Sequence, residues 1–251
     1  MNNVKAIFIK QCTSHIKMPI MLIQGLMFLG MAAAFVFLFA PDEPHECYVC
    51  IPAYVCYVCQ EIEDNRFQLP TPSPAGMFAA IFVGMAMIGA TAQILTEEKT
   101  TSNLRFMAMA DVRPFQYLLG TMASTLLVAT GMLLLFALIG GYIGIETLWF
   151  VAIGVSGGIV SILVGMVLGL SKVPIIAQPI AIILGLGPGF SAMNENLANV
   201  LRFTFIQQVH LAMAGIGEGE DISQNFVIIL INGLVVFAVF AVMHRRNRLN
   251  V

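Results

Sequence analysis

The chain has 251 residues, of which 59% are hydrophobic and only 10% are charged, and its formal net charge is -2. Charged residues make up roughly a quarter of a typical soluble domain, so this composition excludes an ordinary soluble protein, a disordered chain and a small disulfide scaffold. The near-neutral total gives no indication of a nucleic-acid partner. The composition predicts an all-α membrane protein, because helices suit long uncharged spans.

The chain begins with a segment, residues 1–18, that we expect to lie as an amphipathic helix on the membrane surface. Its apolar side chains fall near one side of the helix: Val4, Ile7, Phe8, Cys12 and Ile16. Lys10, Ser14 and Lys17 lie opposite them. Lys5, Gln11 and His15 interrupt the apolar stripe.

Six uncharged runs are long enough to cross a hydrocarbon core of about 30 Å as helices. They are Pro19 to Ala40, Ala75 to Leu95, Tyr117 to about Ile139, Leu148 to Leu170, Val173 to about Met193, and Phe226 to Met243. An even number of spans places both termini on one side. With that side in the cytosol, ten of the twelve basic residues are cytosolic, and only Arg66 and Arg202 are external. The sequence therefore predicts a multi-pass protein of the cell membrane with both termini in the cytosol, folded as one transmembrane domain over residues 1–251.

The first external loop, 41–74, holds four of the five cysteines in the segment CYVCIPAYVCYVC. They are Cys47, Cys50, Cys56 and Cys59. The two CxxC pairs lie closer together than the pairs of a zinc knuckle, and an external loop is oxidising, so disulfides are favoured over a metal site. The sequence does not decide which cysteines pair with each other. A loop held by such disulfides can cap a pore, attract a cationic substrate or simply resist proteases.

The predicted spans contain no group that predicts catalysis or ion binding. They contain no Asp, Glu, Lys, Arg or His, no metal-binding or nucleophile motif is present, and no catalytic residue is predicted. Their amide side chains are Gln93, Gln178 and Asn232, which we interpret as helix-to-helix hydrogen-bonding groups or, alternatively, as pore-lining residues. GxxxxGK[ST] is also absent, so ATP-driven work requires a separate ATPase.

The longest cytosolic loop, 96–116, reads TEEKTTSNLRFMAMADVRPFQ and predicts a short surface helix that ends before Pro114. Three stretches in and after this loop resemble the signature of ABC-2 type exporter permeases: Glu97-Glu98-Lys99, Leu104-Arg105, and the run from Val112 to Gly120, VRPFQYLLG. The layout of an N-terminal helix, six spans and an external segment before the last span is similar as well. Two departures are Ser102-Asn103, where the family has Gly-Thr, and Thr121, where it has lysine.

The resemblance implies the ABC-2 exporter fold and a permease that pairs with a second copy or a paralogue above two ABC ATPase subunits. The chain itself would hold no cofactor, because ATP and magnesium bind to the ATPases. The cytosolic helix would couple ATPase closure to the spans, a role that falls on Glu97, Glu98, Leu104, Arg105 and Phe106. The cargo would be hydrophobic or amphipathic: an antimicrobial peptide, an antibiotic or a lipid. An alternative is a non-transporting sensor or immunity subunit that binds peptide through the cysteine-rich loop.

The last two elements are less regular. Pro174, Pro179 and Pro188, together with three glycines, predict a broken helix in the fifth span. The external segment 194–224 follows, with a helix over Asn194 to Met213 that resembles the re-entrant helices of the same family, although an ordinary surface helix fits as well. Gly215 to Asp221, GIGEGED, predicts a flexible turn into the last span.

Overall fold

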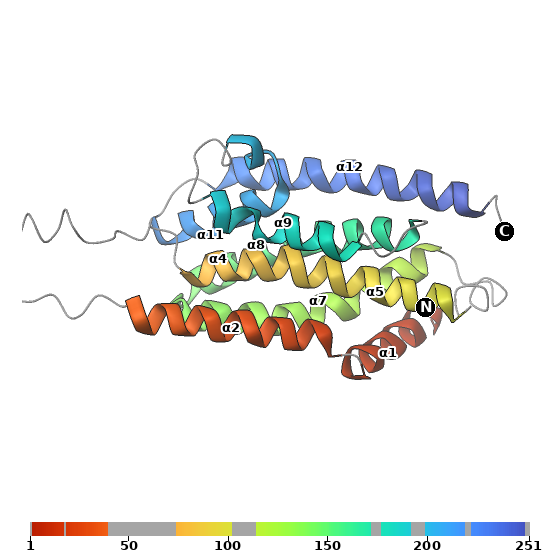
Figure 1. Cartoon of the computed structure of the whole chain (residues 1–251), viewed down its shortest axis with the longest axis horizontal. Helices are drawn as coiled ribbons and strands as arrows, with labels where there is room; N and C mark the ends of the chain where they lie inside the picture. The colour runs from red at the N-terminus through yellow and green to blue at the C-terminus, as the bar shows by residue number, and fades with distance from the viewer. Residues whose placement is uncertain are drawn as a thin grey trace, which may run out of the picture.

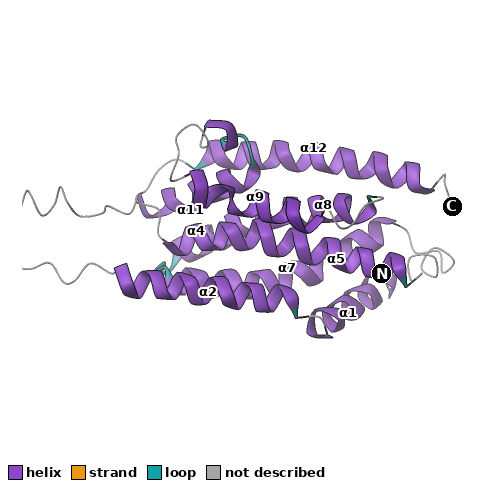
Figure 2. Ribbon diagram, viewed as in Figure 1, coloured by secondary structure: helices purple, strands orange, loops and turns teal. Residues whose placement is uncertain are grey.

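A computed structural model describes residues 2–17, 19–39, 74–101, 114–171, 177–191, 199–218 and 222–248, and every regular element in these ranges is helical. The helices form an elongated bundle (Figures 1 and 2). In chain order they are α1 Asn2–Lys17, α2 Ile20–Phe39, α4 Pro74–Ile81, η1 Phe82–Ala86, α5 Met87–Thr100, α7 Pro114–Ile139, α8 Ile145–Leu170, α9 Ala177–Ser191, α11 Phe205–Glu218 and α12 Ser223–Arg248. The prediction of an all-helical membrane protein is confirmed at this level.

Five helical segments of the described chain are long and apolar enough to cross a membrane, so the protein is a multi-pass membrane protein. They are Ile20–Phe37, Pro74–Thr100, Phe115–Ile139, Ile145–Leu170 and Ser223–Met243. The fifth of the six predicted spans corresponds to α9, of which 15 residues are described, and residues 172–176 and 192–198 on either side lie outside the described part. Figure 1 shows α1 and the last turn of α12 at the same end of the bundle.

The second span is the centre of the bundle. It consists of α4, a five-residue π-helical stretch η1 and α5, which follow one another without a break from Pro74 to Thr100. Phe82, Val83, Met87 and Ile88 are completely buried within it. The helix also continues to Thr100, so Glu97, Glu98 and Lys99 belong to its last turns rather than to the loop that we expected to begin at residue 96.

Small residues let α8 approach this central helix closely. A Cβ atom at Gly165 would lie 2.7 Å from the carbonyl oxygen of Ile88 and 2.9 Å from the Cβ of Thr91. Four residues later, a Cβ at Gly169 would lie 2.9 Å from the Cβ of Leu95. In a membrane the hydrophobic effect does not drive helices together, so helices associate through close packing. Small residues spaced by four allow this packing, because they let two helix backbones come into contact.

α9 crosses the same central helix on another side. A Cβ at Gly84 would lie 3.0 Å from the Cα of Gly185, so the two backbones touch at these glycines. Nearer the start of α9, the Oε1 atom of Gln178 would lie 2.9 Å from a Cβ at Gly89. The described helix is continuous from Ala177 to Ser191, so the predicted break does not occur within that range. Neither Gly185 nor Gly187 interrupts it, and Pro179 sits in its first turn, where a missing N–H costs nothing.

The external segment also differs from the prediction. Residues 199–201 are helical, a turn over 202–204 interrupts the predicted helix, α11 begins at Phe205, and residues 192–198 lie outside the described part. α11 then continues to Glu218, which makes the predicted turn wrong for Gly215 to Glu218. The hydroxyl of Tyr142, in the turn between α7 and α8, donates to the carbonyl oxygen of Met213 at 3.3 Å. Gly215 is buried and Ile216 packs against the hydrophobic core, so the contact of α11 with the bundle continues past Gly215.

Candidate functional site

The most notable polar cluster in the described chain surrounds Glu98, in the last turn of α5. The Nζ atom of Lys10 lies 2.8 Å from its Oε1, and the Nε2 atom of Gln11 donates to the same oxygen at 2.9 Å. The hydroxyl of Tyr117, in the first turn of α7, donates to Oε2. Only 5% of Glu98 is exposed. One buried carboxylate therefore joins α1, α5 and α7, and we call Glu98, Lys10, Gln11 and Tyr117 the Glu98 node.

The face that α1 buries explains how this node forms. Among the side chains of α1 that the structure describes, Ile7, Gln11 and His15, at intervals of four residues, are buried, whereas Phe8 and Cys12 are half-buried. Gln11 and His15, which interrupt the apolar stripe in the sequence, therefore lie on the buried face of the helix. The Nε2 atom of Gln11 and the Nε2 atom of His15 each have a partner inside the protein, which offsets part of the cost of removing these side chains from water.

α7 provides the surface on which α1 rests. A Cβ at Gly120 would lie 2.6 Å from the Cγ2 atom of Ile7, so the absence of a side chain at Gly120 makes room for α1. One turn further along α7, the Oγ1 of Thr125 lies 3.3 Å from the Nε2 of His15. Burial lowers the pKa of the His15 imidazole from its ordinary value of 6.5. We therefore expect His15 to be neutral at pH 7.

The two adjacent glutamates that we assigned to ATPase coupling have different surroundings. Glu97 is exposed, whereas Glu98 is turned into the protein and bonded to α1 and α7. Lys99, next to them, donates from Nζ to the carbonyl oxygen of Ser171 at 3.1 Å, which ties the end of α5 to the end of α8. Leu104, Arg105 and Phe106 lie outside the described residues.

The three amides proposed as pore-lining residues have different surroundings. Gln93 is exposed on α5, and Gln178 packs against Gly89. Asn232 donates from Nδ2 to the carbonyl oxygen of Phe203 at 3.0 Å and to that of Ile228 at 2.9 Å, so it ties α12 to the turn before α11. For Asn232, the interpretation as a helix-tying group is the one its contacts support.

The cysteines of the external loop, Cys47, Cys50, Cys56 and Cys59, lie outside the described residues, so their disulfides stay a prediction. Cys12 on α1 is a free, half-buried thiol. Within the described ranges, no group of three or more His, Cys, Asp or Glu side chains is placed to hold a metal ion.

Sequence reasoning found Glu98 but missed its partners. Lys10 and Gln11 are separated from it by 88 and 87 residues, and nothing in a hydropathy pattern pairs them. The sequence nonetheless contains an indication. Ile7, Gln11 and His15 recur every four residues and so lie on one face of the helix. Polar side chains on such a face favour a hydrogen bond to a buried carboxylate beside it.

Comparisons with protein-family models, with curated proteins and with solved structures found no match to this chain. The site must therefore be interpreted from its own geometry. The carboxylate of the Glu98 node is buried and bonded on both oxygens. Its contacts connect the end of α5 and the start of α7 to the middle of α1.

Proposed function

We propose that this chain is the membrane subunit of an ATP-driven exporter of the ABC-2 type. Its cargo would be a hydrophobic or amphipathic molecule such as an antimicrobial peptide, an antibiotic or a lipid. The observation that carries the proposal is the Glu98 node. It lies where α5 and α7 approach residues 102–113, which contain the predicted coupling helix.

An ATPase outside the membrane can move the membrane helices only if it is rigidly connected to them. The Glu98 node supplies one, because a single buried carboxylate holds the first turn of α7, the last turn of α5 and the middle of α1. A push on residues 102–113 would then displace three helices as one unit. Lys99, bonded to Ser171, would extend the same unit to α8.

The charge distribution supports an external source of energy. In the described spans, charged residues occur only in the last turns of α5, as Glu97, Glu98 and Lys99, and at the start of α8, as Glu146. A carrier driven by protons or sodium places ionisable groups near the middle of the membrane. Glu97, Glu98 and Lys99 instead lie at the end of the second span that we predict to be cytosolic, where a soluble ATPase could reach them, and Glu146 lies on the predicted external side.

The first experiment isolates the tagged full-length chain from its own cells in mild detergent and identifies what co-purifies by mass spectrometry. We expect an ATPase with a GxxxxGK[ST] motif, in about one copy per permease chain, whose hydrolysis rate changes when the permease is removed. A kinase in place of the ATPase would favour the sensor alternative. If the chain alone moves cargo against a gradient in vesicles, the proposal is wrong.

The second experiment tests the coupling helix. A Leu104→Ala, Phe106→Ala double variant should keep normal expression but lose at least about tenfold in ATP-dependent transport, because its contact with the ATPase loses apolar burial. Leu127→Ala is the matched control, since Leu127 is exposed on α7 and far along the chain from the coupling segment. Full transport by the double variant would remove this role from Leu104 and Phe106.

A further inference from the structure

The second span exposes one side chain along most of its length, and that side chain is an amide. Over residues 74–96, Gln93 is the only residue that is exposed, although its neighbours Ala92 and Ile94 are buried. No charged residue occurs in this range, so Gln93 lies within the uncharged part of a membrane helix. The side of a span that faces lipid normally carries apolar side chains, so an amide there indicates a neighbour other than lipid.

A second exposed amide lies on the same side of this helix. Gln178, on α9, is exposed, and its Oε1 atom lies 2.9 Å from the position that a Cβ atom at Gly89 would take. Gly89 precedes Gln93 by four residues, and residues spaced by four lie on the same side of an α-helix. The two amides therefore open on one side of α5 and α9, and we call Gln93 and Gln178 the amide face.

Both amides lie inside the first charged residue of the second span, which is Glu97. Gln93 precedes Glu97 by four residues, or about 6 Å along the helix. Gly89, beside Gln178, precedes it by eight residues, or about 12 Å. Half of a hydrocarbon core is about 15 Å, so with Glu97 at the membrane edge Gln178 lies near the middle of the core.

An amide at this depth needs partners for its donor and acceptor atoms, because hydrocarbon cannot replace the hydrogen bonds that water would give it. Neither Gln93 nor Gln178 bonds to another group in the described part of the chain. Asn232, the amide on α12, shows the alternative, because it donates to two carbonyl oxygens of its own chain. The hydrogen bonds of the amide face must therefore come from outside the described chain.

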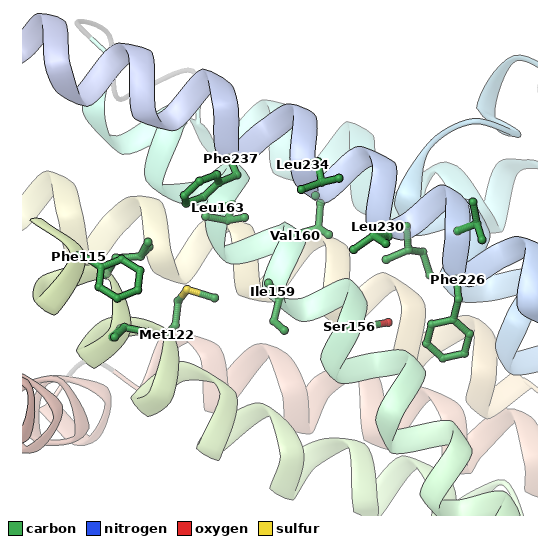
Figure 3. A pocket seen from close by; sticks show the side chains of 15 residues that line it. Phe115, Met122, Ser156, Ile159, Val160, Leu163, Phe226, Leu230, Leu234 and Phe237 are labelled. Atoms are coloured by element: carbon green, nitrogen blue, oxygen red, sulfur yellow. The ribbon is translucent and has the colours of Figure 1, made fainter.

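A groove elsewhere on the bundle shows what lipid can cover. It has a volume of about 560 Å³ and lies between α7, α8 and α12, whose side chains surround it in Figure 3. Ser156 is the one polar side chain in its lining, and the Ser156 hydroxyl donates to the carbonyl oxygen of Ile153 at 2.7 Å. Lipid can fill that groove without leaving a lining side chain unpaired, but it cannot satisfy Gln93 and Gln178.

A second copy of the same chain fits the amide face. A glutamine amide carries both N–H donors and a carbonyl acceptor, so it is complementary to another glutamine. A two-fold interface brings the same surface of both subunits together and sets the amides of one copy against those of the other. The remaining exposed residues among the described side chains of α9, Pro179 and Ile183, are apolar, which suits packed helices better than a water-filled channel.

We propose that two copies of this chain associate in the membrane through the amide face, with hydrogen bonds between glutamine side chains across the interface. This association is a property of the chain alone and needs no ATPase. A failure of self-association would leave the co-purification of an ATPase unaffected, so this proposal and the proposed function fail separately.

The first experiment measures self-association of the full chain in liposomes of dioleoylphosphatidylcholine, by energy transfer between two fluorescent labels at increasing protein-to-lipid ratios. We expect dimers of the unaltered chain and at least about tenfold weaker association of a Gln93→Leu, Gln178→Leu double variant, because leucine cannot replace the hydrogen bonds. Asn232→Leu is the matched control and should associate like the unaltered chain, since the Asn232 amide is bonded within its own chain. A monomeric unaltered chain, or a double variant that associates as tightly, would overturn the proposal.

The second experiment locates the contact in a chain that keeps Gln93. A photoreactive benzophenone amino acid takes the place of Gln178 or, as the control, of Leu127, which is exposed on α7. Illumination in the same liposomes should give covalent dimers from position 178 and lipid adducts from position 127, which mass spectrometry distinguishes. Lipid adducts alone from position 178, or equal yields of dimer from both positions, would show that the two copies do not meet at the amide face.

Discussion

The second span and α12 are both membrane helices, yet the protein buries them very differently. In the most apolar stretch of each, 89% of the residues of the second span are buried and 11% of those of α12. α12 is nevertheless the more apolar helix. In a membrane the apolar side chains belong at the lipid surface, while the interior is built from close backbone contacts and satisfied polar groups.

The largest effect should come from filling the contact between the second span and α8. Gly165→Leu would place atoms within 3 Å of Ile88 and Thr91, so we expect the free energy of unfolding to fall by about 3 kcal/mol or more. Thermal unfolding in detergent measures this. The matched control is Gly131→Leu on α7, where nothing lies within 4 Å of an added Cβ. Equal midpoints for the two variants would refute the close contact.

A smaller loss should follow from Glu98→Gln, which removes the charge from a buried group that Lys10, Gln11 and Tyr117 share. Because the Lys10 side chain is 42% exposed, its pair with Glu98 is partly screened by solvent, and we expect a cost of about 1–2 kcal/mol. Glu97→Gln, one residue away and exposed, should change stability by less than about 0.5 kcal/mol. If the two substitutions cost the same, the node does not stabilise the bundle.

The docking of α1 should depend on pH through His15. The folded protein keeps this imidazole neutral, because burial lowers its pKa, whereas the unfolded chain takes up a proton below about pH 6.5. Stability is therefore greatest above pH 6.5 and falls as the pH drops toward the folded-state pKa. His15→Gln should remove this part of the dependence, which is seen by comparing unfolding midpoints at pH 7.5 and pH 5.5. Parallel losses in both proteins would mean that His15 is not responsible.

The smallest effect should come from α12. Asn232→Leu removes the hydrogen bond to the carbonyl oxygen of Phe203, and such interhelical bonds in membranes contribute about 0.6 kcal/mol on average. The unfolding midpoint should shift by only a degree or two, since α12 otherwise meets mostly lipid. A loss as large as that of Gly165→Leu would show that α12 depends on the bundle as strongly as the second span does.

Helix positions could be predicted from the sequence because length and apolarity decide them. The ends at Ile139 and Leu170 agree with the prediction, since Gly140 and Gly141 follow the first and Lys172 comes soon after the second. The sequence could not predict which side of each helix packs against the protein and which side contacts lipid, because lipid and protein interior are both apolar. Gln11 and His15 show this limit well: their polarity argued for the surface, and contacts with residues more than 80 positions away put them inside.

The order in which the chain is synthesised gives the Glu98 node a further consequence. Lys10 and Gln11 leave the ribosome first, Glu98 follows much later, and Tyr117 completes the set only when the third span begins. A nascent chain that ends after the second span would expose a carboxylate at the bilayer edge without its phenol partner. Docking of the N-terminal helix is therefore a late event in biogenesis, one that marks the insertion of the first three spans as complete.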